Sequence, residues 1–240
     1  MASPRIAITW LGHSAFHLAP AGATPFLFDP WLGNPRAPAH AATIVGDART
    51  IILTHRHADH AGDAVALATR LGATVLAQVE VANHLVSGGL PAPQAIGFNI
   101  GGTARANGLM VTLVQAMHSS SQDTADGPLG QIGTACGAVV AVDQGPVLYN
   151  TGDTGVFGDM ALIAELYRPT ILFLPIGDFY TMGARQAAKA VELVQPEWIV
   201  PQHFATFPGL PGTLADFEAA LAPRFRDRLV RLTPGEAVSL

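Results

Sequence analysis

Short apolar runs alternate with turn residues along the whole chain, and their spacing predicts a mixed α and β fold. Near the N-terminus, runs such as RIAITW (5–10) and PFLFDPW (25–31) are rich in strand-forming residues, as in an antiparallel meander. Further along, strand-like runs such as TILFLPIG (170–177) alternate with runs of helical spacing such as ARQAAKAVELV (184–194). No Ser/Gly-rich linker interrupts the pattern, and the loosest stretch, 33–42, is typical of a loop. We therefore expect one domain over residues 1–240.

The composition indicates unusually complete burial. Of the 240 residues, 49% are hydrophobic and 13% are charged, against about 25% charged in an average soluble protein. Stacked layers, a homo-oligomer interface or both would explain this. The formal net charge is -5, and the 13 basic residues form no dense cluster. Because nucleic-acid binding needs a basic stripe along the phosphates, we expect a small-molecule substrate and no nucleic-acid partner.

The remaining compositional signals favour a cytoplasmic protein without membrane contact. The N-terminus lacks the pattern of a signal peptide, and no apolar run approaches the ~18 residues that a membrane span needs. Cys136 is the only cysteine, so an intrachain disulfide is impossible. Its setting, TACGAVVAV (134–142), predicts a small residue in a buried strand rather than a ligand or nucleophile.

The segment ILTHRHADHAGD (52–63) places ligand-type side chains directly after an apolar strand, with the spacing H-x-H-x-D-H. In extended backbone, His55 and His57 point to the same side and can bind one ion. If a helix begins after His57, it carries Asp59 and His60 towards a second ion. A solvated histidine-rich loop is the alternative, but it gives no reason for four ligand-type residues at this spacing.

Three later strand ends supply further ligand-type residues: His118 after VTLVQAM, Asp153 after VLYNTG and His203 after EWIVPQ. Taken singly, they could be a capped turn histidine, a turn aspartate and a buried core histidine. Strand ends can converge on one crevice at a sheet edge, where these residues would join the cluster. Imidazole and carboxylate are the usual ligands of hydrolytic zinc sites, and Mn²⁺ or Fe²⁺ also accept them. The predicted metal ligands are His55, His57, Asp59, His60, His118, Asp153 and His203.

These motifs carry a family resemblance. THRHADH (54–60), HSS (118–120), TGDTG (151–155) and PQHF (201–204), in that order, resemble the metallo-β-lactamase superfamily. Within it, the chain is most similar to a group of metal-dependent hydrolases that is itself similar to the ascorbate-6-phosphate lactonases. WLGHSAF (10–16), FDPWL (28–32) and PIGDFYTMG (175–183) extend the resemblance from Ile6 to about Phe207.

The resemblance implies an α/β (α+β) fold, a four-layer αββα sandwich with a two-metal site at one sheet edge. It assigns three histidines to the first metal, two histidines and an aspartate to the second, and a bridging role to Asp153. The first set is His55, His57 and His118, and the second is Asp59, His60 and His203. One departure is Arg56, which stands where a small residue such as glycine is expected.

Several residues outside the ligand set are candidates for supporting roles. His13 could line the site and touch substrate, or simply bond to a neighbouring loop. The resemblance places Asp29 under the metal loops, where it would orient a ligand histidine. Tyr180, in a loop with Asp178, could donate to a developing oxyanion or be an edge aromatic, and residues 119–121 are expected to be turn serines. For Arg56, inward pairing with a carboxylate is favoured over attraction of an anionic substrate at the rim.

The predicted chemistry is metal-dependent hydrolysis. Two divalent ions, with Zn²⁺ favoured, would hold a bridging hydroxide that attacks a small ester, lactone or phosphoester. Asp59 would orient this hydroxide and take its proton, with His13 and Tyr180 as further catalytic candidates. Alternatives are a nuclease or phosphodiesterase of the same fold, a di-iron redox protein, and a non-catalytic metal-binding module. The di-iron branch prefers a glutamate where His57 stands.

Overall fold

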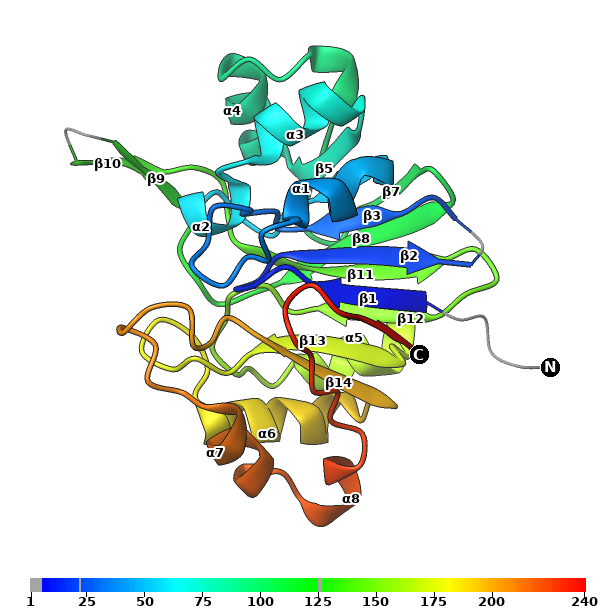
Figure 1. Ribbon diagram of the computed structural model, residues 1–240, viewed down its shortest axis with the longest axis vertical. Helices are drawn as coiled ribbons and strands as arrows, with labels where there is room; N and C mark the ends of the chain where they lie inside the picture. Colours follow the sequence, from blue (N-terminus) through cyan, green and yellow to red (C-terminus); the bar gives the residue numbers. More distant parts are fainter. Residues whose placement is uncertain (1–5, 22, 125–126) are drawn as a thin grey trace.

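The computed structural model describes residues 6–21, 23–124 and 127–240, and two main β-sheets dominate it (Figure 1). The first sheet is antiparallel from β15 to β3 and parallel from β3 to β6. Its order is β15 (Ala237–Ser239), β1 (Ile6–Trp10), β2 (Phe16–Pro20), β3 (Phe26–Phe28), β4 (Thr50–Ile52), β5 (Thr74–Gln78) and β6 (Ala95–Phe98).

The second sheet has the same mixture of pairings. It is antiparallel from β7 to β12 and parallel from β12 to β14. Its order is β14 (Trp198–Gln202), β13 (Ile171–Pro175), β12 (Val147–Asn150), β11 (Cys136–Val142), β8 (Leu109–Gln115) and β7 (Thr103–Ala106). A separate antiparallel hairpin of β9 (Ser121–Thr124) and β10 (Gly127–Gln131) projects to one side (Figure 1).

Helices cover the outer face of each sheet, which gives four layers. Beside the first sheet lie α1 (Ala41–Ile44), η1 (Val45–Asp47), α2 (Ala58–Ala61), α3 (Ala64–Leu71), α4 (Val79–Ser87) and η2 (Ala92–Gln94). Beside the second lie α5 (Met160–Tyr167), α6 (Ala184–Val194), α7 (Leu214–Ala220) and α8 (Pro223–Arg226). None of these helices, within the described ranges, is long and apolar enough to cross a membrane. The predicted αββα sandwich is confirmed.

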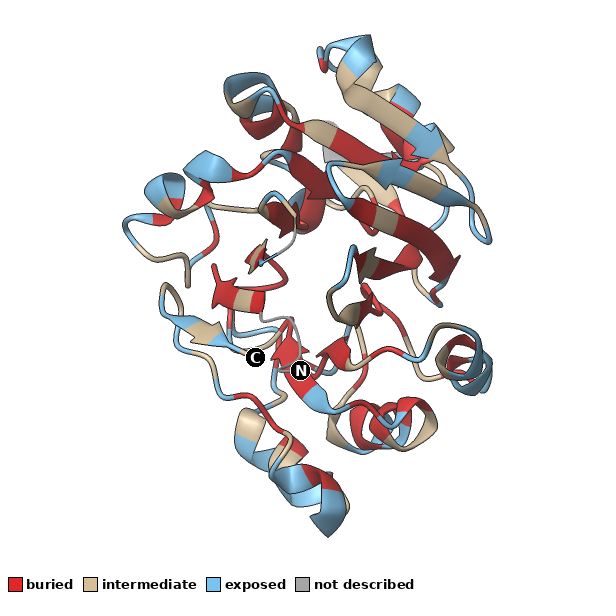
Figure 2. Ribbon diagram, turned by 90° about the vertical axis from the view of Figure 1, so that its right-hand side faces the viewer, coloured by how far each residue is buried: buried red, intermediate tan, exposed pale blue. Residues whose placement is uncertain are grey.

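Three apolar clusters fill the spaces between the layers. Figure 2 shows the buried residues in red. In β13, Ile171 and Phe173 face the cluster between the sheets, whereas Leu172 and Leu174 face the cluster under α5, α6 and α7. A strand buried on both faces reads as a continuous apolar run, which is how the sequence indicates it. Cys136 is buried in the central cluster, as expected, and its thiol donates to the carbonyl of Thr54 (3.1 Å).

Some elements were not predicted from the sequence. β6, β7, β15, α1 and the β9–β10 hairpin are short or lack a clear hydrophobic period. The loop expected at 33–42 is present, although its last two residues begin α1. The run RIAITW starts at a residue outside the described ranges, and β1 begins at Ile6.

The topology brings many strand ends to one edge of the sandwich. β1, β3 and β4 run in the same direction within the first sheet, and β8, β12, β13 and β14 do so within the second. The residues that follow the carboxyl ends of six of these strands meet at this edge, as their contacts below establish. The fold therefore gathers polar side chains from distant parts of the chain.

Candidate metal centre

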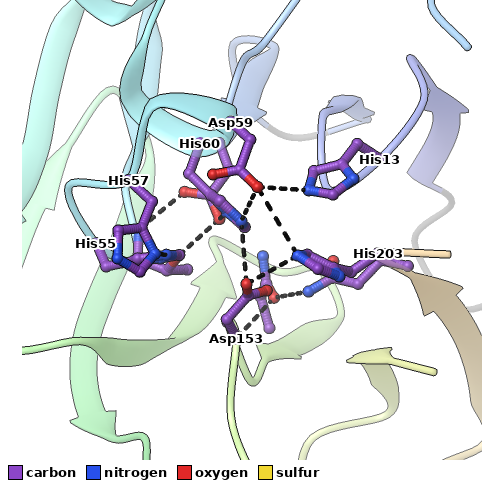
Figure 3. A network of polar contacts seen from close by, with 12 residues as sticks. His13, His55, His57, Asp59, His60, Asp153 and His203 are labelled. Atoms are coloured by element: carbon purple, nitrogen blue, oxygen red, sulfur yellow. Dashed lines mark hydrogen bonds and ion pairs between the residues drawn. The ribbon is translucent and has the colours of Figure 1, made fainter. Parts of the chain in front are cut away.

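Each predicted site residue follows the end of a strand at this edge, and Figure 3 shows the side chains pointing towards one another. The two segments after β4 and β12 form the middle of the cluster, and those after β8 and β14 flank them. The positions are His13 after β1, Asp29 after β3, His55, His57, Asp59 and His60 after β4, His118 after β8, Asp153 after β12 and His203 after β14.

The segment after β4 divides its ligands between two groups. His57 is the N-cap residue of α2, with extended backbone angles (φ -55°, ψ 148°), so the expected helix after His57 is present. Nε2 of His55 lies 2.9 Å from Nδ1 of His57, and both rings pack against the ring of His118 at 5.2 Å. The structure thus groups His55, His57 and His118.

A second group contains Asp59, His60 and His203, with His13 beside them. Asp153 touches both groups. Its Oδ2 lies 3.0 Å from Nε2 of His203, 3.3 Å from Nε2 of His60 and 3.7 Å from Nε2 of His118. This central position is the one that a bridging ligand would need.

The unpaired atoms of the cluster fit a metal ion. Nε2 of His60 and Oδ1 of Asp153 are buried and make no hydrogen bond. Buried polar atoms are nearly always paired, so orphaned atoms that converge need an explanation. Imidazole nitrogens and carboxylate oxygens within 4.8 Å of one another form the donor set that Zn²⁺ and similar divalent ions bind.

A fully buried aspartate under the cluster fixes two of the histidines. Oδ1 of Asp29 accepts from the backbone N–H of Thr54 (2.8 Å), and Oδ2 accepts from the Thr54 hydroxyl (2.6 Å) and from Nδ1 of His60 (2.9 Å). Since the Thr54 hydroxyl donates to Asp29, it accepts from Nδ1 of His55 (3.0 Å). Both histidines therefore carry their proton on Nδ1, which leaves Nε2 free to bind a metal.

Electrostatics inside the cluster also favour a cation. Burial alone would raise the pKa of Asp153, but His203 and His60 hold it well below its usual range. Burial likewise opposes ionisation of Asp59, and again His60 and His13 keep its pKa low. Burial disfavours charge on His60, yet the carboxylates of Asp153, Asp59 and Asp29 raise its pKa well above the ordinary value. The buried carboxylates thus hold a positive charge, which a divalent ion would supply by displacing the proton.

His13 stands behind the cluster rather than at its surface. Of the two roles considered for His13, the bond to a neighbouring loop is present: its side chain is fully buried, with Nε2 3.1 Å from Oδ2 of Asp59 and Nδ1 2.9 Å from the Thr206 hydroxyl. Burial lowers the pKa of His13 to about 4, despite the hydrogen bond to Asp59. The neutral ring therefore donates from Nε2 to Asp59, and Nδ1 accepts from Thr206. Such a residue positions Asp59.

A cavity of about 550 Å³ opens above the cluster. Its floor is polar, and three aromatic side chains, Trp31, Tyr180 and Phe207, form its walls. Tyr180 is 54% exposed. No lysine or arginine is among the described residues that line it. The described residues that line it are Trp31, His57, Ala58, Asp59, His118, Ser119, Ser121, Asp153, Tyr180, His203 and Phe207.

Of the serines after His118, Ser119 and Ser120 lie in the loop and Ser121 begins β9. The hydroxyl of Ser120 donates to the carbonyl of Ile132 (2.6 Å) and accepts from the backbone N–H of Arg56 (3.1 Å). Ser120 thereby ties the loop after β8 to the metal-ligand segment after β4. Asp178, in the Tyr180 loop, accepts from the N–H of Phe179 (2.8 Å) and does not line the cavity.

The carboxylate pairing that we favoured for Arg56 is not found among the described side chains, which exclude that of Asp123. Arg56 lines a different cavity from the one that His57 lines, so its side chain points away from the metal cavity. Burial lowers the pKa of the guanidinium.

Four residues with clear roles at the site were not singled out from the sequence: Thr54, Thr206, Trp31 and Phe207. Thr54 adjoins the histidine motif and could have been found as a strand-end hydroxyl beside a ligand. Thr206 is 193 residues from its partner His13, and no local pattern links the two. Trp31 directly follows FDP (28–30), and Phe207 directly follows PQHFAT (201–206). An apolar residue after a polar turn is only a weak indication that its side chain lines a site.

Comparison with known proteins agrees with this architecture. Residues 24–204 match the family model described as the beta-lactamase superfamily domain. A UPF0173 metal-dependent hydrolase of Herpetosiphon aurantiacus is 42% identical over 232 residues, covering 96% of each chain. One of Archaeoglobus fulgidus is 43% identical over 232 residues, covering 96% of this chain and 97% of that protein.

A solved structure is similar over the same length. Igni18, described as a novel metallo hydrolase from the hyperthermophilic archaeon Ignicoccus hospitalis, superposes with a TM-score of 0.85 and 35% identity, covering 98% of both chains. The fold, the family match and the relatives at about 40% identity all indicate the same family. The chain belongs to the beta-lactamase superfamily and, within it, to the UPF0173 metal-dependent hydrolases.

Proposed function

We propose that this chain hydrolyses a small carboxylic ester or lactone with water activated by two divalent metal ions. The observation that carries the proposal is the convergence of seven histidine and aspartate side chains with unpaired buried atoms, five of which line one cavity. The names of the relatives, metal-dependent hydrolases, support the same class of reaction.

Bound divalent ions would lower the pKa of water and polarise the scissile carbonyl. In this proposal His55, His57 and His118 hold one ion, Asp59, His60 and His203 hold the other, and Asp153 contacts both. Asp59 lines the cavity as an ionised carboxylate, so it can accept a hydrogen bond from the attacking water and orient it. His13 holds Asp59 in that orientation from behind.

The cavity lining favours an uncharged substrate. Trp31, Tyr180 and Phe207 offer apolar surface for an acyl or alcohol group, and the Tyr180 hydroxyl is available as a donor to the developing oxyanion. A phosphoester or a nucleic acid carries negative charge that lysine or arginine would normally meet. The proposed metal ions would meet part of that charge. Because the described lining offers no lysine or arginine for the rest, we favour a neutral ester or lactone over a phosphoester.

The test is a substrate panel on protein loaded with Zn²⁺, Mn²⁺ or Fe²⁺. We expect turnover of aryl esters and lactones to exceed turnover of aryl phosphates and phosphodiesters. Asp59→Asn should abolish the activity, whereas the matched control Asp227→Asn, an exposed aspartate far along the chain, should retain it. A preference for phosphodiesters or RNA would favour the nuclease alternative. Full metal loading with no turnover of any class would favour a binding module.

A further inference from the structure

A second cavity, of about 390 Å³, lies between α3, α4 and β9, on the other side of the metal-ligand segment. Arg56 and Gln122 line it, whereas their chain neighbours His57 and Ser121 line the metal cavity. The segment after β4 and the start of β9 therefore form a wall between the two cavities. No residue in the described part of the chain lines both.

Arg56 brings a positive charge to this cavity that no described side chain compensates. Its Nε is buried without a hydrogen-bond partner, and no carboxylate among the described side chains, which exclude that of Asp123, lies within 4.0 Å of its guanidinium. The last turn of α4, which contributes Ser87, lies on the same cavity and carries a partial negative charge. Its carbonyls accept no hydrogen bond from Arg56. A half-buried guanidinium without an anion is costly, since burial removes water without replacing it.

The other polar groups around the cavity add donors and no described carboxylate. Nε2 of His84 donates to Oε1 of Gln122 at 2.5 Å, which fixes the orientation of that amide. The amide NH₂ of Gln122 is then left with no partner among the described residues. The hydroxyl of Ser87 donates to the carbonyl of Asn83 (3.1 Å), so its oxygen can only accept a further bond. The usable donors are the Arg56 guanidinium and the Gln122 amide.

We propose that this cavity binds a small oxyanion, a phosphate or carboxylate group, held by Arg56 and Gln122. Guanidinium binds both kinds of group through paired N–H donors, and a neighbouring amide can add another bond. The site is separate from the proposed hydrolytic centre. An anion there would brace the wall that holds His55 and His57, because Arg56 lies between them. Its binding does not require the protein to be a hydrolase.

The test is calorimetric titration of metal-loaded protein with inorganic phosphate, with malonate as the carboxylate probe and chloride at equal ionic strength as the reference. Phosphate also binds metal ions, so the titration is repeated after chelation, with circular dichroism confirming that the fold persists. We expect one phosphate or malonate site that survives chelation. Arg56→Gln should weaken it by about tenfold or more, and Gln122→Ala by a few-fold. Arg70→Gln, an exposed arginine on α3, is the matched control and should leave it unchanged.

Equal anion affinity in Arg56→Gln and Arg70→Gln would overturn the proposal, as would loss of all anion binding on chelation. A lower melting temperature of Arg56→Gln without any change in anion affinity would also overturn it, because Arg56 would then serve only the α4 terminus. If Arg56→Gln does not fold, unchanged affinity in Gln122→Ala is the contradicting result and weakened affinity the supporting one. Preference for phosphate or for malonate identifies the class of the natural anion.

Discussion

Replacing Asp29 by asparagine should weaken metal binding although Asp29 touches no metal in the proposed arrangement. The carboxylate is fully buried and accepts three hydrogen bonds, two from Thr54 and one from Nδ1 of His60. Asparagine keeps one acceptor oxygen, which can still meet the Thr54 N–H. Its NH₂ group would then face the N–H of His60, so two donors would oppose each other.

The size of the effect on stability follows from the hydrogen bonds that the Asp29→Asn variant loses. The Asp29→Asn variant would lose one or two charge-assisted bonds, worth about 1.5–3 kcal/mol each. We expect the free energy of unfolding of the metal-loaded protein to fall by roughly 3 kcal/mol, or roughly 10 °C in melting temperature for a chain of this size. Because Asp29 also fixes the Nδ1 protons of His60 and, through Thr54, of His55, metal affinity should fall by about 10–100-fold.

The assay is competition with a chromophoric chelator, run beside thermal unfolding. Asp47→Asn is the matched control: Asp47 also pairs with a histidine, His17, at 2.7 Å, but its side chain is 62% exposed and distant from the cluster. We expect Asp47→Asn to cost at most about 1 kcal/mol and to leave metal affinity unchanged. Equal metal affinity in Asp29→Asn and wild type would show that Asp29 does not set metal affinity through His60 and Thr54, whatever happens to the melting temperature.

Three further predictions concern the cluster itself. Asp153→Ala should lower the occupancy of both metal sites, whereas His203→Ala should chiefly empty one of the two sites. Metal analysis of the purified variants measures this, and full occupancy in Asp153→Ala would contradict the bridging assignment. Tyr180→Phe should lower kcat on esters by about tenfold, less than the 10²–10³ of a buried oxyanion donor, and an unchanged kcat would reduce Tyr180 to an edge aromatic. Since the pKa of His13 falls from 6.5 to about 4 on folding, the unfolded chain binds more protons there between these values. The metal-free protein should therefore lose stability as pH falls from 6.5 to 4, and His13→Asn should lose less, as thermal unfolding at pH 7.5 and 5 would measure.

The ligand cluster could be predicted from the sequence because four of its residues lie together in one short segment. The spacing of His55, His57, Asp59 and His60 encodes an extended segment followed by a helical turn, and both are present. His118, Asp153 and His203 could be added because each follows an apolar run, and strand ends of a mixed sheet converge. The roles of these residues as ligands are still predictions, to be tested by metal analysis.

What the sequence did not reveal depends on contacts between distant segments. The sequence left two roles open for His13, and the choice between them depends on Thr206 and on the loop after β14. The orientation of Arg56 depends on α4 and β9, which pack beside the metal-ligand segment from the outside. Within the described residues, β9 and β10 form a separate two-stranded sheet, so neither main sheet imposes its hydrophobic period on them.

The central claim is that two divalent ions bind at this cluster and make the chain a hydrolase. Its most direct test is elemental analysis of protein reconstituted with Zn²⁺, Mn²⁺ or Fe²⁺, with ester and lactone turnover measured on the same samples. We expect about two ions per chain, with activity that disappears on chelation and returns on reloading. Substantially less than one ion per chain with every metal would contradict it.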